Sequence, residues 1–579
     1  MLRILKNALI AIGAGVALGW ADASAVCTPI GVLLLLSGLW SLKGPRQAWK
    51  GFGFAFLAGV TAFAIQLYWL SVVSWLGAIV LPLYLGLFFG AFGAFAASRG
   101  NPWRQPGRKS SLGITFANAA VWAFLEWLRG WLFTGFGWNG LGVAFHDAPW
   151  VAQAADLFGV CGISLLLVWI SGLLIMGGTR WRLSRGQAGS ENRNGVATGR
   201  QDQVAAVLMV ALVFGYGWFR IHQENGRETI PLKTLLVQIN IPQEAAERLW
   251  DPTQIHMAYQ EDTLAALEKA KDAGQFPDWV IWPESALTGR IMRTDDGGWG
   301  TWQENMETIS NVREPGDFTL IYGVNELEAV EEPDGNLMRK PDGKAYNSMA
   351  VMSPQDDLQT FQKHHLVIFG ETIPFVDSIP FLKKIYEMQA GVQYGGSFSP
   401  GTSFEPLPAL AGGNTIGIIP SVCFEDTVPR LLRRFVKPSP QVIVNVTNDG
   451  WFKESKAAKQ HFANAKFRAV ELRRPMIRCA NTGVSALLTS TGSTDDPKTG
   501  KSRILTGPPN GDHFTRSTLL DTLEIPVNPA TTLYAIIGDW GIIGLGVVGL
   551  LFALKNRARP YTETTSPEIT LEKDRSPCK

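Results

Sequence analysis

Three polar side chains follow short apolar runs of the kind that form buried strands, and together they have the groups that nucleophilic chemistry needs. Cys423 ends the run "IGIIPSV", Glu284 follows "DWVIWP", and Lys363 lies in the loop after "NSMAVMSP". A thiol attacks a carbonyl at neutral pH when a base takes its proton and a cation favours the thiolate. Glu284 and Lys363 offer these two groups, and Lys363 with backbone N–H groups can stabilise an oxyanion.

Each of the three residues also has a purely structural interpretation. A buried Cys at a strand end is more often a small apolar residue than a nucleophile. An acid after "WP" is usually a loop carboxylate, and a Lys among polar residues is usually solvated. The spacing of the three residues does not by itself show that they meet.

The segment that carries these residues alternates strand-like and helix-like stretches. Continuous apolar runs such as "VIVNV" indicate strands that are buried on both faces, which is typical of a layered α/β domain with helices outside the sheets. The pattern predicts helices at about 252–273, 301–312 and 456–473.

The rest of the chain is apolar enough to cross a membrane several times. Runs that approach the length needed for a roughly 30 Å hydrocarbon layer lie at about 7–20, 28–41, 53–74, 77–97, 113–133, 161–178, 204–219 and 532–554. The start "MLRILK" followed by "ADASA" also fits a cleaved signal peptide. We favour a retained first helix because further spans follow it.

Basic residues predict the orientation of these spans, because Lys and Arg near span ends stay cytoplasmic. They occur before the first span and after the second, fourth and sixth, whereas the loops 21–27 and 134–160 contain neither Lys nor Arg. We therefore expect both termini in the cytoplasm. The predicted domains are a membrane domain of about seven helices (1–220), an extracytoplasmic catalytic domain (221–531), a transmembrane helix (532–554) and a disordered cytoplasmic tail (555–579).

Composition argues against several other classes of protein. The formal net charge of +2 gives no reason to expect a nucleic-acid partner. The five cysteines are scattered without a CxxC spacing, so neither a disulfide framework nor a zinc site is indicated. The only adjacent histidines are His364 and His365. We expect no metal and no cofactor.

Three motifs, in order, resemble the nitrilase, or carbon–nitrogen hydrolase, superfamily: "WPES", "KHHLVIFGE" and "PSVCFED". Within it the chain resembles the membrane-bound apolipoprotein N-acyltransferase family through "VQINIPQ", "YNSMAVM", "NVTNDGWF", "QHFANAKFRAVELRRPMIRCANTGVSA", "TLYAIIGD" and "EWLRGWLFTGFGWNGLG". The resemblance covers essentially the whole chain. It implies a multi-span α-helical membrane domain joined to an extracytoplasmic αββα sandwich.

The resemblance also implies roles for individual residues. Glu284 would be the base, Lys363 the oxyanion and charge stabiliser, and Cys423 the nucleophile of a Glu-Lys-Cys triad. Supporting or substrate-binding positions would be Glu371, Glu425, Phe424, Trp250 and Tyr394. The chain departs from the family pattern at Gly137 and Ile368, where Pro is frequent, and at Phe424, where Tyr is frequent.

The implied activity is acyl transfer by a ping-pong mechanism. Cys423 would take an acyl chain from a phospholipid as a thioester and pass it to the N-terminal amine of a diacylglyceryl-cysteine apolipoprotein, the final step of lipoprotein maturation. The resemblance places the enzyme in the bacterial cytoplasmic (inner) membrane with its catalytic domain on the periplasmic side. We expect a monomer.

Three other functions fit parts of the pattern. A transporter is disfavoured because the spans hold few ionisable residues beyond Glu126 and Arg129, which stand three apart on one helical face and can pair. A membrane-tethered amidase would use the same thioester and let water attack it. A catalytically inactive scaffold is disfavoured because all three triad positions are intact.

Overall fold

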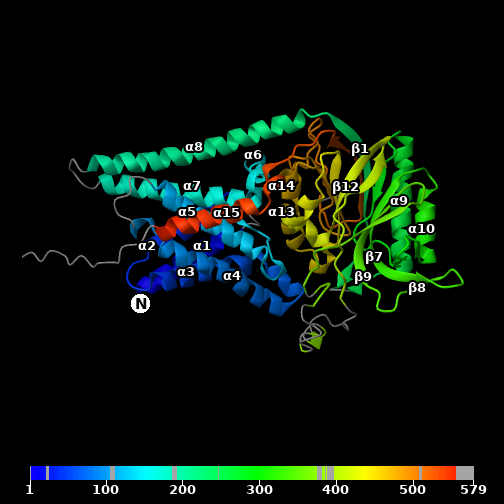
Figure 1. Cartoon of the computed structure of the whole chain (residues 1–579), viewed down its shortest axis with the longest axis horizontal. Helices are drawn as coiled ribbons and strands as arrows, with labels where there is room; N and C mark the ends of the chain where they lie inside the picture. Colours follow the sequence, from blue (N-terminus) through cyan, green and yellow to red (C-terminus); the bar gives the residue numbers. More distant parts are fainter. Residues whose placement is uncertain are drawn as a thin grey trace, which may run out of the picture.

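The computed structural model describes residues 2–20, 25–104, 111–185, 192–244, 247–368, 370–373, 381, 383–384, 387, 397–507 and 511–555, and the statements below concern these residues. A helical bundle and a sheet-rich domain lie end to end (Figure 1). The N-terminus is at the end of the bundle that is remote from the sheets. Tyr394 and the predicted tail after Lys555 lie outside the described residues.

The bundle is built from the apolar runs. Its long helices are α1 (Leu2–Gly19), α2 (Cys27–Ser41), α3 (Gln47–Gln66), α4 (Trp75–Ala97), α5 (Leu112–Arg129), α7 (Ala155–Arg185), α8 (Asn192–Asn225) and α15 (Trp540–Lys555). Within the described residues four helical segments are long and apolar enough to cross a membrane, namely 47–66, 75–104, 155–182 and 199–225. Shorter apolar helices lie at 4–19, 27–41 and 540–555.

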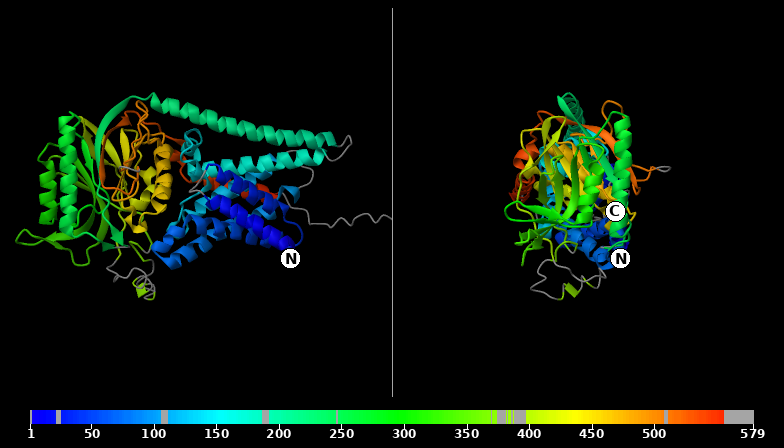
Figure 2. Two further views of the ribbon diagram at one scale, coloured as in Figure 1. Left: turned by 180° about the vertical axis from the view of Figure 1, so that it is seen from behind. Right: turned by 90° about the vertical axis from the view of Figure 1, so that its right-hand side faces the viewer.

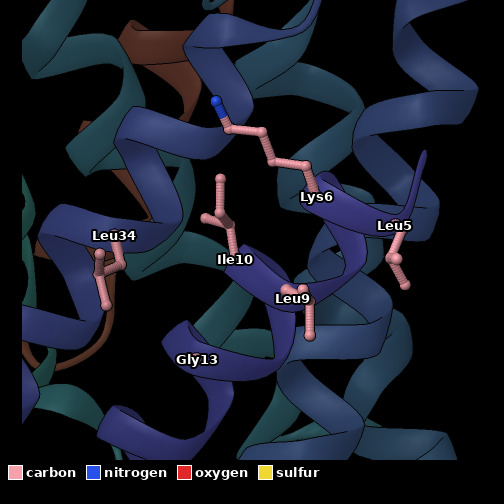
Figure 3. Close-up of a pocket in the computed structure, with 6 residues that line it drawn as sticks. All are labelled: Leu5, Lys6, Leu9, Ile10, Gly13 and Leu34. Carbon is pink, nitrogen blue, oxygen red and sulfur yellow. The ribbon is translucent and has the colours of Figure 1, made fainter. Parts of the chain in front are cut away.

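Small residues set how closely these helices pack. A Cβ placed on Gly51 of α3 would lie 2.2 Å from the carbonyl oxygen of Gly93 on α4, and the reverse is equally tight. Such close approach of backbones is the usual way in which helices associate in lipid, where burying apolar surface gives no advantage. A shallow apolar groove between α1 and α2, lined by Leu5, Lys6, Leu9, Ile10, Gly13 and Leu34 (Figure 3), lies near the N-terminal end of the bundle, away from the sheets.

The sheet-rich domain contains two sheets packed face to face. The first has the strand order β10-β9-β7-β4-β1-β16 and the second β11-β12-β13-β14-β15. Their bounds are β1 Thr229–Gln238, β4 Trp279–Ile281, β7 Thr319–Glu331, β9 Ala345–Met352, β10 Leu358–Gln362, β16 Ser517–Pro526, β11 Leu407–Ala411, β12 Asn414–Val422, β13 Gln441–Thr447, β14 Met476–Ala480 and β15 Ala486–Leu488. One buried cluster, with Leu236, Ile281 and Met349 from the first sheet and Ile418, Val444 and Ile477 from the second, fills the space between them.

Helices cover the outer faces of both sheets. The helices α9 (Pro252–Asp272) and α10 (Gln303–Arg313) lie over the first sheet, and α13 (Ala457–Leu472) lies over the second, between the sheets and the bundle (Figure 2). A capping box between Asp251 and Gln254, with Pro252 in the first turn, begins α9. The predicted αββα sandwich and multi-span helical domain are confirmed, and the three predicted helices end within two residues of their expected bounds.

Shorter elements complete the chain. They are α6 Pro149–Ala152, α12 Pro429–Leu432, α14 Leu533–Ile537, β2 Gln243–Glu244, β3 Glu247–Arg248, β5 Ile291–Arg293, β6 Trp299–Thr301, β8 Leu337–Arg339 and the 3-10 helices η1 Tyr68–Val72, η2 Pro102–Arg104, η3 Leu132–Thr134, η4 Leu141–Phe145, η5 Cys423–Thr427, η6 Arg433–Phe435 and η7 Asp449–Phe452.

Glu126 and Arg129, which stand three apart on α5, form no ion pair with each other and have other hydrogen-bond partners. Glu126 accepts hydrogen bonds from the Ser164 hydroxyl, the Leu141 N–H and the Trp122 indole. Arg129 instead donates to the carbonyl of Trp138. The loop after α5 folds back over the helix end, so both side chains bind that loop, and Glu126 also binds Trp122 of its own helix and Ser164 of α7.

The helix α13 joins the two halves of the molecule. Nearly all of its side chains are buried. Gln460 donates to the Gln66 carbonyl of α3 at 3.0 Å and accepts from the Trp69 indole at 3.0 Å, while Lys466 binds Asp147 at 2.6 Å. Polar bonds from one helix therefore hold the sandwich directly against the membrane bundle.

Candidate active site

Glu284 is buried and lies three residues after the end of β4, an interior strand of the first sheet. Its Oε1 accepts a hydrogen bond from the Asn347 amide at 2.8 Å. Burial raises the pKa of Glu284, whereas the Lys363 ammonium and a hydrogen bond from the Cys423 thiol oppose that rise. A carboxyl whose pKa is moved towards neutrality suits a general base.

Only glycine fits at position 323, because its backbone lies directly against the backbone of Glu284. Gly323 on β7 donates its N–H to the Pro283 carbonyl at 3.0 Å, and its own carbonyl accepts from Ala286 at 3.0 Å. A Cβ on Gly323 would lie 2.4 Å from the Glu284 Cα. This close approach fixes the height of the carboxyl above the sheet.

Lys363 leaves the end of β10 and is 1% exposed. Its Nζ donates to Glu371 at 2.9 Å, and its backbone N–H donates to the Asn347 carbonyl at 2.8 Å. Burial opposes the charge of Lys363, but Glu371, Cys423 and Glu284 together raise its pKa above the ordinary value. The side chain is therefore a charged ammonium at neutral pH.

Cys423 stands at the turn between β12 and η5 and has a φ of 54°. For a residue other than glycine such a left-handed conformation costs of order 1–3 kcal/mol and is found most often at functional sites. The Asn445 amide donates to the Cys423 carbonyl at 3.1 Å and helps to hold the turn. Burial and the nearby Glu284 raise the pKa of the Cys423 thiol well above its usual value, so the thiol is protonated at rest.

The predicted supporting acids tie the loops of the site together. Glu425 accepts three backbone N–H groups, from His364 at 2.7 Å, His365 at 2.9 Å and Val422 at 2.9 Å. It thereby joins the loop of Lys363 to the strand of Cys423. Burial raises the pKa of Glu425 to about 7, although the Lys363 charge opposes this.

Glu371 holds the lysine itself. Besides Lys363 it accepts the Asn347 amide at 2.6 Å and the Val367 N–H at 2.9 Å. Asn347 thus bridges Glu284 and Glu371, a role that sequence reasoning missed because the residue reads only as part of a strand.

Phe424 forms the contact between this site and the bundle. Its ring lies between Trp138 of the loop after α5, with centroids 5.8 Å apart and planes at 14°, and His365, at 5.8 Å and 12°. Trp250 packs against the buried cluster beneath α9 and α10, which also contains Trp282 and Ala286.

A buried charged cluster lies beneath the Cys423 turn and was not predicted. His461 of α13 binds Asp426 through Nε2 at 2.8 Å and Asp449 through Nδ1 at 2.7 Å, and Arg478 of β14 binds both aspartates at 3.2 Å. Although burial opposes the charge, the two aspartates raise the pKa of His461 to about 9. The Trp138 ring stacks on His461 at 5.1 Å, so the cluster links the turn to the bundle.

No metal site is apparent in this part of the molecule. Among the described residues no group of three or more His, Cys, Asp or Glu side chains could hold a metal ion. The rings of His364 and His365 stack on Phe361 and Phe424 instead.

Two family models match the chain. Residues 13–173 match the apolipoprotein N-acyltransferase N-terminal domain, and residues 236–499 match the carbon-nitrogen hydrolase family. The apolipoprotein N-acyltransferase of Geobacter metallireducens is 33% identical over 467 residues, 78% of each chain. That of Methylococcus capsulatus is 29% identical over 563 residues, 96% of this chain and 97% of the relative.

Solved structures from the nitrilase superfamily match about half of the chain. An amidase from Nesterenkonia sp. AN1 has 13% identity and a TM-score of 0.31, with 54% of this chain and 96% of the amidase covered. The identity and coverage shared with the Geobacter relative, together with the two matching domain models, show that this chain belongs to the apolipoprotein N-acyltransferase family.

Proposed function

We propose that the chain transfers an acyl group from a phospholipid, through a thioester at Cys423, to the N-terminal amine of a diacylglyceryl-cysteine apolipoprotein. The observation that carries this proposal is the group formed by buried Glu284, buried Lys363 and half-buried Cys423, which meets the membrane bundle through Phe424. Family membership supports the same acceptor and donor classes.

In the first half-reaction the thiol proton passes to the Glu284 carboxylate as the sulfur attacks the ester carbonyl of the phospholipid. Charge then develops on the carbonyl oxygen, where the Lys363 ammonium and the backbone N–H groups of the Cys423 turn act as stabilisers. When the tetrahedral intermediate collapses, the C–O bond breaks. Glu284 returns its proton to the leaving oxygen, which releases a lysophospholipid.

In the second half-reaction the neutral amine of the acceptor attacks the thioester carbonyl. Glu284 takes a proton from the attacking nitrogen, the C–S bond breaks, and the thiolate receives that proton. The products are an amide and the free thiol. A ping-pong scheme follows because one thiol serves both steps.

The aromatic surroundings support lipid substrates rather than small amides. Phe424, Trp138 and Phe136 form a continuous ring contact between Cys423 and the bundle. The basic loops at the opposite end of the bundle support a cytoplasmic location for the termini and a periplasmic location for the sandwich in a bacterial inner membrane. We propose that the protein is a monomer.

Intact-mass measurement tests the proposal. The purified chain is incubated with a phospholipid and no acceptor, and is compared with Cys423→Ser. We expect a fatty-acyl mass increment that hydroxylamine removes and that the variant lacks. If no increment forms while lysophospholipid or ammonia is released from candidate substrates, the chain is a hydrolase and the proposal is wrong.

A further inference from the structure

A basic segment follows the nucleophile turn directly. Residues 429–437, "PRLLRRFVK", form α12 and η6 and contain no acidic residue. Leu431, Leu432 and Phe435 are buried in the core between the sheets. The arginines of the segment point away from this core. Two of them, Arg430 and Arg433, reach the ends of membrane helices.

Arg430 contacts the loop that follows α5. Its Nη1 donates to the Gly130 carbonyl at 2.8 Å, and its Nη2 lies 3.4 Å from the Thr134 carbonyl. Phe133 in this loop has a φ of 53° and is 74% exposed. An exposed aromatic residue at a helix end is typical of the lipid–water interface.

Arg433 contacts the segment that leads into α15. Its Nη1 donates to the Ala535 carbonyl of α14 at 2.9 Å and lies 3.5 Å from the Ile536 carbonyl. Ile536 is 65% exposed and Trp540, the first residue of α15, is 74% exposed. Arg430 and Arg433 therefore both lie where α5 and α15 leave the bundle.

Neither arginine has a carboxylate within ion-pair distance among the described residues. The carboxylate whose charge acts on Arg430 is that of Asp539. The oxygens of Asp539 already accept the Trp127 indole at 2.9 Å and the Tyr534 hydroxyl at 3.1 Å. Guanidinium groups have five N–H donors, so both arginines keep donors and positive charge for another acceptor.

Arg430 and Arg433 bring positive charge to the end of the bundle where α5 ends and α15 begins. The loop 134–160 at the same end of the bundle contains no Lys or Arg. A lipid phosphate is the anion found at this depth, and the planar guanidinium fork matches its geometry.

Arg430 also lies close enough to the candidate site to affect it. Burial and the Arg430 charge lower the pKa of His365, whose ring stacks on Phe424, the residue next to the nucleophile. The bonds of Arg430 to Gly130 and Thr134 place it on the bundle side of the Cys423 turn. In a diacyl phospholipid the phosphate is separated from the ester carbonyls by the short glycerol unit.

We propose that Arg430 and Arg433 bind the phosphate group of the phospholipid donor while its ester carbonyl lies at Cys423. The inference rests on the proposed function and adds the part of the molecule that recognises the donor. Arg430 and Arg433 are substrate-binding residues in this scheme, not participants in bond making.

Two donors with the same acyl chains test the proposal. The full-length chain is assayed for acyl-enzyme formation, by intact mass, with dipalmitoyl phosphatidylethanolamine or with dipalmitoylglycerol, which lacks the phosphate. For the double variant Arg430→Gln, Arg433→Gln we expect the KM for the phospholipid to rise about tenfold, equivalent to about 1.4 kcal/mol. The KM for dipalmitoylglycerol should change less than about twofold by the same conversion.

Controls separate recognition from folding. Arg434→Gln is the matched control, because Arg434 is exposed and lies over the Phe404 ring rather than at the bundle. It should leave both donors unaffected. Arg430→Lys keeps the positive charge but lacks the two parallel N–H donors of the guanidinium group. It should give an intermediate KM for the phospholipid.

Three outcomes would overturn the inference. An equal loss with both donors means that the arginines act only in structure. An unchanged phospholipid KM together with inhibition of the wild type by inorganic phosphate means that they bind free phosphate. If the wild type forms no acyl-enzyme from the phospholipid, the proposed function itself is refuted. An unchanged KM refutes only the role of the two arginines and leaves the proposed function standing.

Discussion

Replacing Gly323 by alanine should displace the proposed base without touching any of the reacting groups. The new Cβ would lie 2.4 Å from the Glu284 Cα, 2.8 Å from the Ser285 nitrogen and 2.9 Å from the Pro283 carbonyl oxygen, whereas an ordinary contact begins at 3.4 Å. All three atoms belong to the backbone, so no side chain can rotate away. The Glu284 segment must therefore move by about 1 Å, the difference between these contact distances.

A displacement of this size has a calculable effect on rate. Misplacement of a catalytic group by about 1 Å can lower a rate by about 10²-fold, which corresponds to about 2.7 kcal/mol in the barrier. Overpacking by one methyl group also destabilises a fold by about 1–3 kcal/mol. We expect Gly323→Ala to form acyl-enzyme about 100 times more slowly than the wild type, while it remains folded.

The assay is the single-turnover rate of acyl-enzyme formation from a phospholipid, with thermal unfolding measured in parallel. Gly300→Ala on β6 is the matched control, because its Cβ would meet only the flexible Leu337 side chain at 3.0 Å. A Gly323→Ala chain that reacts within about threefold of the wild type, against the 10²-fold expected, would refute the reasoning. The position of Glu284 would then not set the rate.

Three further predictions follow from the same contacts. Glu284→Gln should slow acyl-enzyme formation by about 10²–10⁴-fold, the usual contribution of a general base, in the same assay; a normal rate would remove Glu284 as the base. Burial raises the pKa of Glu425 to about 7. Between the ordinary carboxyl pKa and pH 7 the folded chain therefore binds more protons than the unfolded chain. The melting temperature of the protein should fall as the pH rises through this window. Glu425→Gln should lose this dependence, and an identical pH profile in both proteins would contradict the assignment. His461→Gln removes the imidazolium that binds Asp426 and Asp449. It should lower the free energy of unfolding by about 3–5 kcal/mol. A denaturant unfolding curve that matches the wild type would show that the cluster is not ionic.

Much of the fold is visible in the pattern of apolar residues. Strands such as β13 are apolar and buried along most of their length, and a continuous apolar run of this kind is enough to indicate a layered domain. The membrane runs are equally local, because a helix in lipid satisfies its own backbone hydrogen bonds. The predicted helix bounds are accurate for the same reason.

The surroundings of the three polar residues were only partly predictable. Glu371 and Glu425 were assigned from motifs, and both indeed contact the Lys363 loop. The bridging Asn347 and the cluster of His461 with two aspartates were missed, because each contact joins residues far apart in the chain. Trp250 packs against the cluster that includes Trp282 and Ala286, and its assignment to the site stays a prediction.

By itself, the sequence determined which residue types stand at the strand ends and which segments are apolar enough for a bilayer. Those properties depend on side-chain chemistry and on the periods of helix and strand, which are local. Only the tertiary structure decided that Cys423 adopts a left-handed backbone, that Glu284 is pressed against Gly323, and that α13 carries bonds from the bundle to the nucleophile turn. These features depend on the distances between elements that packing brings together, and no local pattern encodes a distance.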